Sequence, residues 1–185
     1  MEINSLDIPL RPFMGIMAVA PTRRVSSIPP GCFGGNIDLK HLVPGTRLYL
    51  PVQVPGALFF TGDGHGVQGN GEVNLTALET SMTTTLEFVL HQRRSLAWPM
   101  AETATHYIVM GLHEDLDTAA ADAVQRTIEV LQAFAEVDAG EAYALSSLVV
   151  DFEVTQLVDG VKGIHGCIPK SLFASMAGSW WGPVP

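Results

Sequence analysis

The stretch RLYLPVQVPGALFFTGDGHGVQGNGEVN, residues 47–74, joins two predicted strands to a loop that holds five glycines. Apolar side chains stand at every second position over residues 48–54, which is the period of a half-buried strand. Pro51 indicates an edge strand or a bulge. ALFFTGD, residues 57–63, predicts a second strand that leads into the loop. Because glycine loses the most backbone freedom on folding, the five glycines of residues 62–71 indicate a backbone that bends sharply or is closely approached.

Three further segments have the pattern of strands. SMTTTLEFVLHQ (residues 81–92) is rich in threonine and alternates apolar with polar side chains. ATHYIVMGL (residues 104–112) and VDFEVTQLV (residues 150–158) are rich in β-branched and aromatic residues. The chain before residue 113 is therefore expected to be predominantly β.

Helical periodicity becomes clear only in the second half of the chain. We expect a long helix around residues 117–138, with Asp117 as its N-cap and Gly140 ending it. Its apolar stripe consists of Val124, Ile128, Leu131 and Ala135. EAYALSSL predicts a second, short helix around residues 141–148. The pattern predicts an α+β fold: a predominantly β, sandwich or barrel-like sheet with the long helix packed on it, in a single domain over residues 1–185.

The composition is that of a globular protein with a sizeable core, since 47% of residues are hydrophobic and only 16% are charged. Ten basic and 19 acidic side chains give a net charge of −9, which argues against nucleic acid or an anionic membrane as the partner. No segment approaches the ~18 uninterrupted apolar residues of a membrane span. The N-terminal MEINSLDIPLRPF lacks a basic region followed by an apolar run. We therefore expect a cytoplasmic protein.

The glycine-rich loop offers three side chains that can bind a metal ion or carry protons. Asp63 and His65 are two residues apart and point to the same side if the backbone is extended, and Glu72 follows in the same loop. Such a set can bind a divalent cation or transfer protons. By spacing alone, a turn-rich loop whose polar side chains cap its own backbone is favoured. The G-x-G-x-x-G pattern at residues 64–69 does not open a helix, which excludes a dinucleotide site.

Other histidines and the cysteines are weaker candidates. His41 follows a Gly-Gly turn, a pattern that favours an exposed histidine in a hairpin. The KGIHGC pattern leaves open whether His165 is a ligand or a structural residue. Cys167 lies two residues further on, which alone is poor evidence for a thiol activated by histidine. Cys32 is the only other cysteine, so a disulfide framework or a zinc site built from several thiolates is not expected.

Several motifs, taken together, resemble the acetamidase/formamidase family. They are IPLRPFMGIMAVAP (residues 8–21), CFGGNIDLKHL (residues 32–42), the stretch of residues 47–74 with its GDGHGVQGNGE, and HYIVMGLHEDLDTA (residues 106–119). The following helix and KGIHGCIPKSLF extend the resemblance over nearly the whole chain. The ordered run of motifs is far more specific than any one of them.

The resemblance implies hydrolysis of a short aliphatic amide, of the formamide or acetamide type, to a carboxylate and ammonia. The glycines would then let backbone groups approach a very small substrate. We hypothesise that Asp63 and His65 hold a divalent metal ion, zinc or calcium, which lowers the pKa of a bound water to about 7. The catalytic candidates are Glu72 for proton transfer, Asp63, and Asn36 for the oxyanion. The substrate-binding candidates are Gln68, Asp38, Gly66 and Glu79.

The sequence departs from the family pattern in two ways. Asn70 stands where the family commonly has aspartate, so that an acid is missing or the position only supports the loop. The chain is also shorter than family members and resembles their C-terminal portion without the N-terminal β-domain. The alternative is a partner-dependent or non-catalytic half-subunit, or a small-molecule binding protein, with a separate N-terminal-half subunit as the partner. The resemblance and the apolar tail with Trp180 and Trp181 favour a homo-oligomer, namely a dimer.

Overall fold

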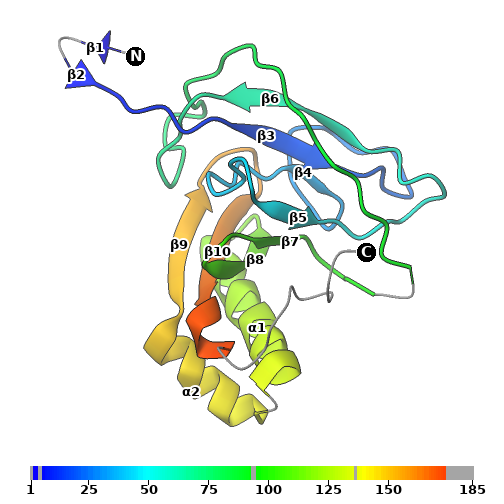
Figure 1. Cartoon of the computed structure of the whole chain (residues 1–185), viewed down its shortest axis with the longest axis vertical. Coiled ribbons are helices and arrows are strands. Elements are labelled where there is room, and N and C mark those ends of the chain that lie inside the picture. The colour runs from blue at the N-terminus through cyan, green and yellow to red at the C-terminus, as the bar shows by residue number, and fades with distance from the viewer. Residues whose placement is uncertain (1, 4–5, 93–94, 136, 174–185) are drawn as a thin grey trace.

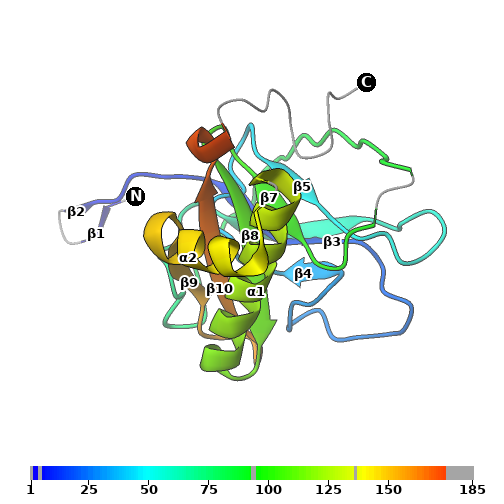
Figure 2. The ribbon, with the colours of Figure 1, turned by 90° about the horizontal axis from the view of Figure 1, so that it is seen from below.

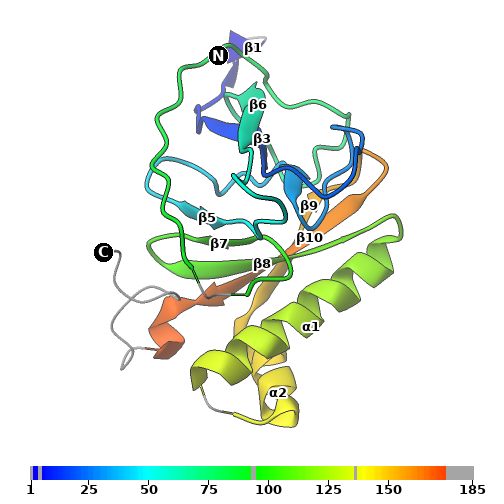
Figure 3. The ribbon, with the colours of Figure 1, turned by 90° about the vertical axis from the view of Figure 1, so that its right-hand side faces the viewer.

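Three layers make up the computed structural model, which describes residues 2–3, 6–92, 95–135 and 137–173 (Figure 1). Two helices cover one face of a five-stranded sheet, here named the helix side, and a three-stranded sheet with long loops covers the other, the loop side (Figure 3). Apolar clusters fill both interfaces. Val109, Leu131 and Ile168 belong to the helix-side cluster, whereas Ile108 and Met110 belong to the loop-side cluster. The predicted α+β class, predominantly β, is confirmed.

The central sheet is antiparallel, with the strand order β5–β7–β8–β10–β9. The strands are β5 (Arg47–Tyr49), β7 (Met100–Glu102), β8 (His106–His113), β9 (Asp151–Gln156) and β10 (Lys162–Pro169). β8 and β10 are buried on both faces, so successive residues pack on opposite sides. The predicted strands over residues 104–112 and 150–158 correspond to β8 and β9. β10 was not predicted, because two glycines interrupt its apolar pattern.

α1 (Leu116–Ala135) and α2 (Ala139–Val149) lie against the sheet on the helix side, and Figure 2 shows them in front of β8, β9 and β10. A 3-10 turn, η1 (Lys170–Phe173), follows β10. The predicted long and short helices are confirmed, but their ends differ. Asp115 Oδ1, rather than Asp117, accepts the Thr118 N–H at 2.8 Å. Gly140 lies in the first turn of α2, because Asp138 and Glu141 form a capping box there.

α1 also turns a different face to the sheet from the predicted stripe. Its buried residues are Ala119, Ala123, Thr127, Val130 and Leu131, so that only Leu131 of the predicted stripe is among them. A Cβ on Gly111 of β8 would lie 1.9 Å from the Ala119 carbonyl oxygen. The helix packs through its smallest side chains, which allow the closest approach, and apolar periodicity alone does not reveal this.

The loop side carries a sheet of order β4–β3–β6. Its strands are β3 (Phe13–Ala18), β4 (Gly34–Asn36) and β6 (Phe60–His65), and a separate hairpin pairs β1 (Glu2–Ile3) with β2 (Leu6–Asp7). The strand predicted over residues 57–63 therefore begins later and runs on through His65. The strand predicted over residues 47–54 is confined to β5, ending before Pro51, which has no N–H to donate.

The strand predicted over residues 81–92 is wrong. The segment is described throughout and contains no strand, and Phe88 and Leu90 are 69% and 70% exposed. Its alternation is genuine, but a strand also needs a neighbouring strand to receive its backbone hydrogen bonds. None of the described strands provides that edge here.

Within the described ranges, no helix has both the length and the apolar character needed to cross a bilayer. Trp180 and Trp181 lie outside the described residues. The contact predicted for them stays a prediction.

Candidate active site

Asp63 and His65 lie two residues apart on β6, and their side chains meet. His65 Nε2 lies 3.0 Å from Asp63 Oδ2 and 3.9 Å from Asp38 Oδ1. Asp38 follows β4, which pairs with β3 on the edge opposite β6. One potential ligand atom from each of the three residues lies within 4.8 Å of the others. The predicted Asp-x-His pair is therefore formed, and Asp38 joins it.

Gln68 fixes the orientation of the His65 ring. Its Nε2 donates to the Asp38 carbonyl at 2.8 Å, so its Oε1 faces His65 Nδ1 at 2.9 Å and accepts a hydrogen bond from the Nδ1–H. His65 Nε2 then faces the Asp63 carboxylate. The contact at 3.0 Å is one that a shared proton or a cation bound between the two groups would explain.

Asp38 also belongs to a second group of acids, with Glu72 and Asp159. Burial raises the pKa of Asp38 to about 10, and the neighbouring carboxyl groups of Glu72 and Asp159 add to this effect. Burial likewise raises the pKa of Glu72 and that of Asp159. Asp38 Oδ1 is buried and meets no hydrogen-bond donor among the described residues. The carboxylate site, meaning Asp38, Asp63, His65, Glu72 and Asp159, must therefore hold protons or a cation at neutral pH.

All four acids of the carboxylate site have left-handed backbone conformations. Their φ angles are 46° for Asp38, 56° for Asp63, 40° for Glu72 and 64° for Asp159. They account for four of the seven described non-glycine residues with positive φ. Such conformations are uncommon outside glycine and tend to occur at functional sites, where the surrounding structure maintains them. The fold thus holds these four carboxyl groups in the carboxylate site at a cost in backbone energy.

Gly15 on β3 lies directly against this site. A Cβ at this position would lie 2.6 Å from Asp38 Oδ1, 2.8 Å from Asp63 Oδ2 and 2.8 Å from His65 Cε1. The missing side chain therefore leaves the potential ligands room to come together. Sequence reasoning did not single out Gly15, since no local pattern links it to the loop.

Two of the five loop glycines, Gly64 and Gly66, serve packing within the chain. A Cβ on Gly64 would lie 2.6 Å from the Thr80 carbonyl oxygen, and one on Gly66 would lie 3.3 Å from the Leu78 carbonyl oxygen. The Gly66 N–H donates to Leu78 and the Thr80 N–H donates to Gly64, both at 2.7 Å. These glycines admit the returning segment of the chain itself, a physical reason different from the expected approach of a small substrate.

The predicted substrate-binding and catalytic residues are not all brought together. The backbone of Glu79 bridges that of His65, but the Glu79 side chain is exposed and accepts the Thr76 hydroxyl at 2.7 Å. Asn36 does approach the site, since its side chain hydrogen-bonds to Asp159 while its Oδ1 is buried without a donor. Asp159 was missed. The only signal for it was an Asp-Gly turn, which gave no link to the loop around residue 63.

Asn70 supports the loop. Its Nδ2 donates to Glu153 Oε2 on β9, and this contact lowers the pKa of Glu153. An aspartate at this position would place two carboxylates against each other. Asparagine is therefore compatible with the local charges. All five residues of the carboxylate site are present with asparagine at this position.

A hollow with a volume of about 360 Å³ lies beside the site. Gln68 and Glu72 contribute polar groups to its wall, and Ile8, Val67 and Leu78 contribute apolar surface. A polar reacting group attached to a short apolar chain would match this lining.

Comparison with known proteins places this chain in a family. The sequence pattern of the Acetamidase/Formamidase family matches residues 17–175. The chain belongs to the acetamidase/formamidase family. An acetamidase of Bacillus halodurans superposes with a TM-score of 0.90 at 32% identity, over 95% of this chain and 60% of that protein. An acetamidase of Yersinia enterocolitica gives a TM-score of 0.87 at 32% identity, over 90% and 51%.

The sequence similarity to curated relatives is local. An acetamidase of Mycolicibacterium smegmatis is 46% identical over 48 residues, which are 26% of this chain and 12% of that protein. This acetamidase/formamidase family member thus spans about 60% of the Bacillus halodurans structure it matches.

Proposed function

We propose that this family member hydrolyses a short aliphatic amide, of the formamide or acetamide type, to a carboxylate and ammonia. The observation that carries the proposal is the carboxylate site, where four acids and a histidine converge on a buried position beside a hollow. The names of the acetamidase relatives agree with this chemistry.

The donor set fits a divalent cation. Asp38, Asp63 and His65 offer two carboxylates and one imidazole, and Asp38 Oδ1 has no donor to satisfy it. The close approach of His65 Nε2 to Asp63 Oδ2 is also what two ligands of one ion would show. When bound, a zinc-class ion would supply a Lewis acid that increases the acidity of a water molecule and polarises the amide carbonyl.

Glu72 is the residue suited to move protons. It is 6% exposed, and burial raises its pKa above the usual carboxyl value, the direction that suits a general base. In the proposed reaction it takes a proton from the attacking water and returns it to the departing nitrogen. Asp38, with its pKa of about 10, keeps its own proton in the absence of a cation and donates it within the acid group.

Asn36 and Gln68 have different roles in this proposal. Asn36 bonds Asp159 at the site and offers its amide to the developing oxyanion. Both ends of the Gln68 amide are engaged, with His65 and with Asp38, so Gln68 positions the imidazole. The substrate contact predicted for Gln68 stays a prediction beside this positioning role.

The test is ammonia release from formamide and acetamide by the purified chain, with a divalent cation supplied. Glu72→Gln is expected to lower kcat/KM by about 100-fold or more, because it removes the proton acceptor. Glu87→Gln is the matched control, since Glu87 is an exposed glutamate outside the site. Full activity in folded Glu72→Gln protein would refute this mechanism.

A second candidate is a subunit that acts only with a partner polypeptide. The chain spans 60% of the Bacillus halodurans acetamidase. A folded wild-type chain that releases no ammonia would support it. Light scattering on the same sample tests the predicted homodimer.

A further inference from the structure

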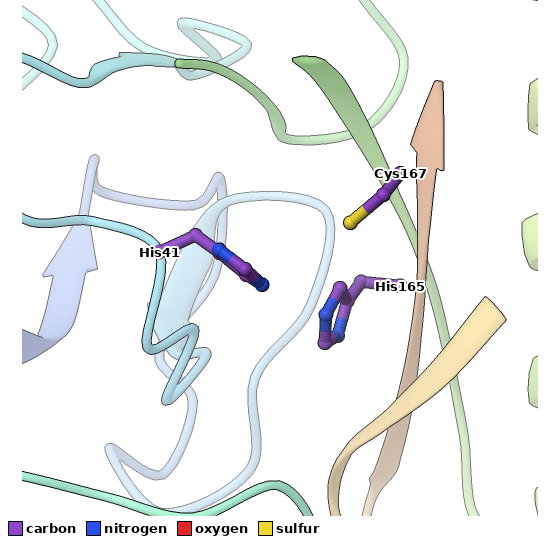
Figure 4. Close-up of side chains that lie close together, drawn as sticks. All are labelled: His41, His165 and Cys167. Atoms are coloured by element: carbon purple, nitrogen blue, oxygen red, sulfur yellow. The ribbon is translucent and has the colours of Figure 1, made fainter. Parts of the chain in front are cut away.

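Outside the carboxylate site, a second group of potential ligands lies on the loop side of the central sheet. His165 and Cys167 are two residues apart on β10, so both side chains point to the same face. His41 comes from the chain after β4 and meets them from the opposite layer (Figure 4). One potential ligand atom of each residue lies within 4.8 Å of the others. This histidine–cysteine cluster consists of His41, His165 and Cys167.

The two histidines have unused nitrogen atoms. His165 is fully buried, and His41 is half-buried, correcting the prediction that His41 is exposed. Among the residues that the structure describes, no group hydrogen-bonds to Nε2 of either ring. His165 Nδ1 lies 2.8 Å from Thr155 Oγ1, so a proton on Nδ1 would leave Nε2 with a free lone pair. Two buried nitrogen atoms without partners require an explanation.

A histidine-activated thiol does not explain the cluster. Burial raises the pKa of Cys167 to about 11, with the Glu153 and Asp151 carboxylates adding to it, so the free thiol is not ionised at neutral pH. Burial lowers the pKa of His165 to about 4 and also lowers that of His41. Both rings are therefore neutral, the form in which imidazole binds metals. A cation can displace the thiol proton as it binds.

We propose that His41, His165 and Cys167 form a binding site for a zinc-class divalent cation, separate from the carboxylate site. Glu153 Oε2, 3.7 Å from His165 Nε2, lies beside the remaining coordination position. Two imidazoles and one thiolate select zinc, cobalt or copper over calcium and magnesium, which prefer oxygen ligands. Zinc bonds of about 2.0–2.3 Å place tetrahedral ligand atoms about 3.3–3.8 Å apart, within reach of small side-chain rotations here. The proposal does not depend on amide hydrolysis.

Cobalt(II) is the probe, because a thiolate ligand gives cobalt a charge-transfer absorption in the near ultraviolet that carboxylate and imidazole ligands do not. The purified full chain, stripped with a chelator, is titrated with cobalt(II) alone. We expect the band at saturation to have the intensity of one thiolate–cobalt bond per chain and to disappear when zinc is added. No band at saturating cobalt would overturn the proposal.

The two cysteines supply the matched control. Cys32→Ser leaves Cys167 as the only thiol and is expected to keep the full band, whereas Cys167→Ala is expected to abolish it. If Cys167→Ala does not fold, His41→Gln replaces it, since His41 is less buried. His41→Gln is expected to weaken cobalt binding at least 10-fold. Asp63→Asn is expected to keep the band, and a band lost in Asp63→Asn but retained in Cys167→Ala would overturn the proposal.

Discussion

The two faces of the central sheet are built from the same strands but hold different chemistry. On β10, Ile164 and Ile168 pack on the helix side, whereas His165 and Cys167 face the loop side. The helix side holds apolar side chains and two regular helices. The loop side holds acids, histidines and amides that are buried with few partners. A strand buried on both faces thus separates stabilising contacts from reactive groups by the alternation of its side chains.

The backbone shows the same difference. None of the residues of α1 and α2 has positive φ, whereas the four acids of the carboxylate site do. Regular helices satisfy their own backbone hydrogen bonds and need only an apolar face, while the loop side depends on tertiary contacts to hold strained residues. The helix side should therefore respond to substitution through stability, and the loop side through activity and protonation.

Gly111→Ala should give the largest effect, and on stability. The new Cβ would lie 1.9 Å from the Ala119 carbonyl oxygen and 2.6 Å from the Ala123 nitrogen, so α1 must move away from β8. We expect a loss of about 3 kcal/mol or more in the free energy of unfolding, measured by urea denaturation. Gly62→Ala is the control, because its Cβ meets nothing within 4 Å. A Gly111→Ala protein as stable as this control would contradict the close packing of α1 against β8.

Gly15→Ala should give the opposite pattern. Its Cβ meets the ends of side chains, Asp38 and Asp63 among them, which can rotate away. The unfolding free energy is then expected to fall by only about 1 kcal/mol. Displacing catalytic groups by about 1 Å is expected to lower kcat/KM for the amide about 100-fold. Normal activity together with a large loss of stability would break the comparison between the two sides.

The sequence predicted the helix side better than the loop side, for a physical reason. Helix periodicity is local, so the long and short helices could be placed from residues 117–148 alone, whereas the predicted caps Asp117 and Gly140 were wrong. The β-pattern of residues 81–92 gave a wrong strand, because pairing depends on an edge that local sequence does not specify. Small residues at Gly111 and Ala119 then decided which face of α1 packs.

The candidate site was predicted in part. Asp63 and His65 share one face of β6, which their spacing of two residues indicated, and Asn36 and Asp38 were identified through the family resemblance. Asp159 and Gly15 reach the site only through tertiary structure, so no spacing could connect them. The backbone of Glu79 bridges His65, yet its side chain is exposed and bonds Thr76, so backbone proximity does not bring a side chain into the site.

Asp38→Asn should change the pH dependence of stability on the loop side. The Asp38 pKa rises from 3.8 to about 10 on folding, so its contribution is fully present below about pH 4 and is lost as pH rises towards 10. With a chelator present, Asp38→Asn is expected to match wild type near pH 4 and to exceed it by about 1–2 kcal/mol near pH 8. Asparagine also tolerates the φ of 46°. A variant less stable than wild type at pH 8 would mean that Asp38 is ionised and paired.

Asp138→Ala should give the smallest effect and confine it to the helix side. The Asp138 side chain accepts the Glu141 N–H at 2.9 Å in the capping box of α2, far in sequence from the carboxylate site. Its loss is expected to cost about 1 kcal/mol in unfolding free energy, and Asp138→Ser is expected to restore most of it. Ammonia release well below the melting temperature is expected to remain unchanged, since α2 holds none of the reactive groups. A proportional fall in activity would show that strain on the helix side passes through β9 and β10 to the loop side, and the two faces would then be coupled rather than separate.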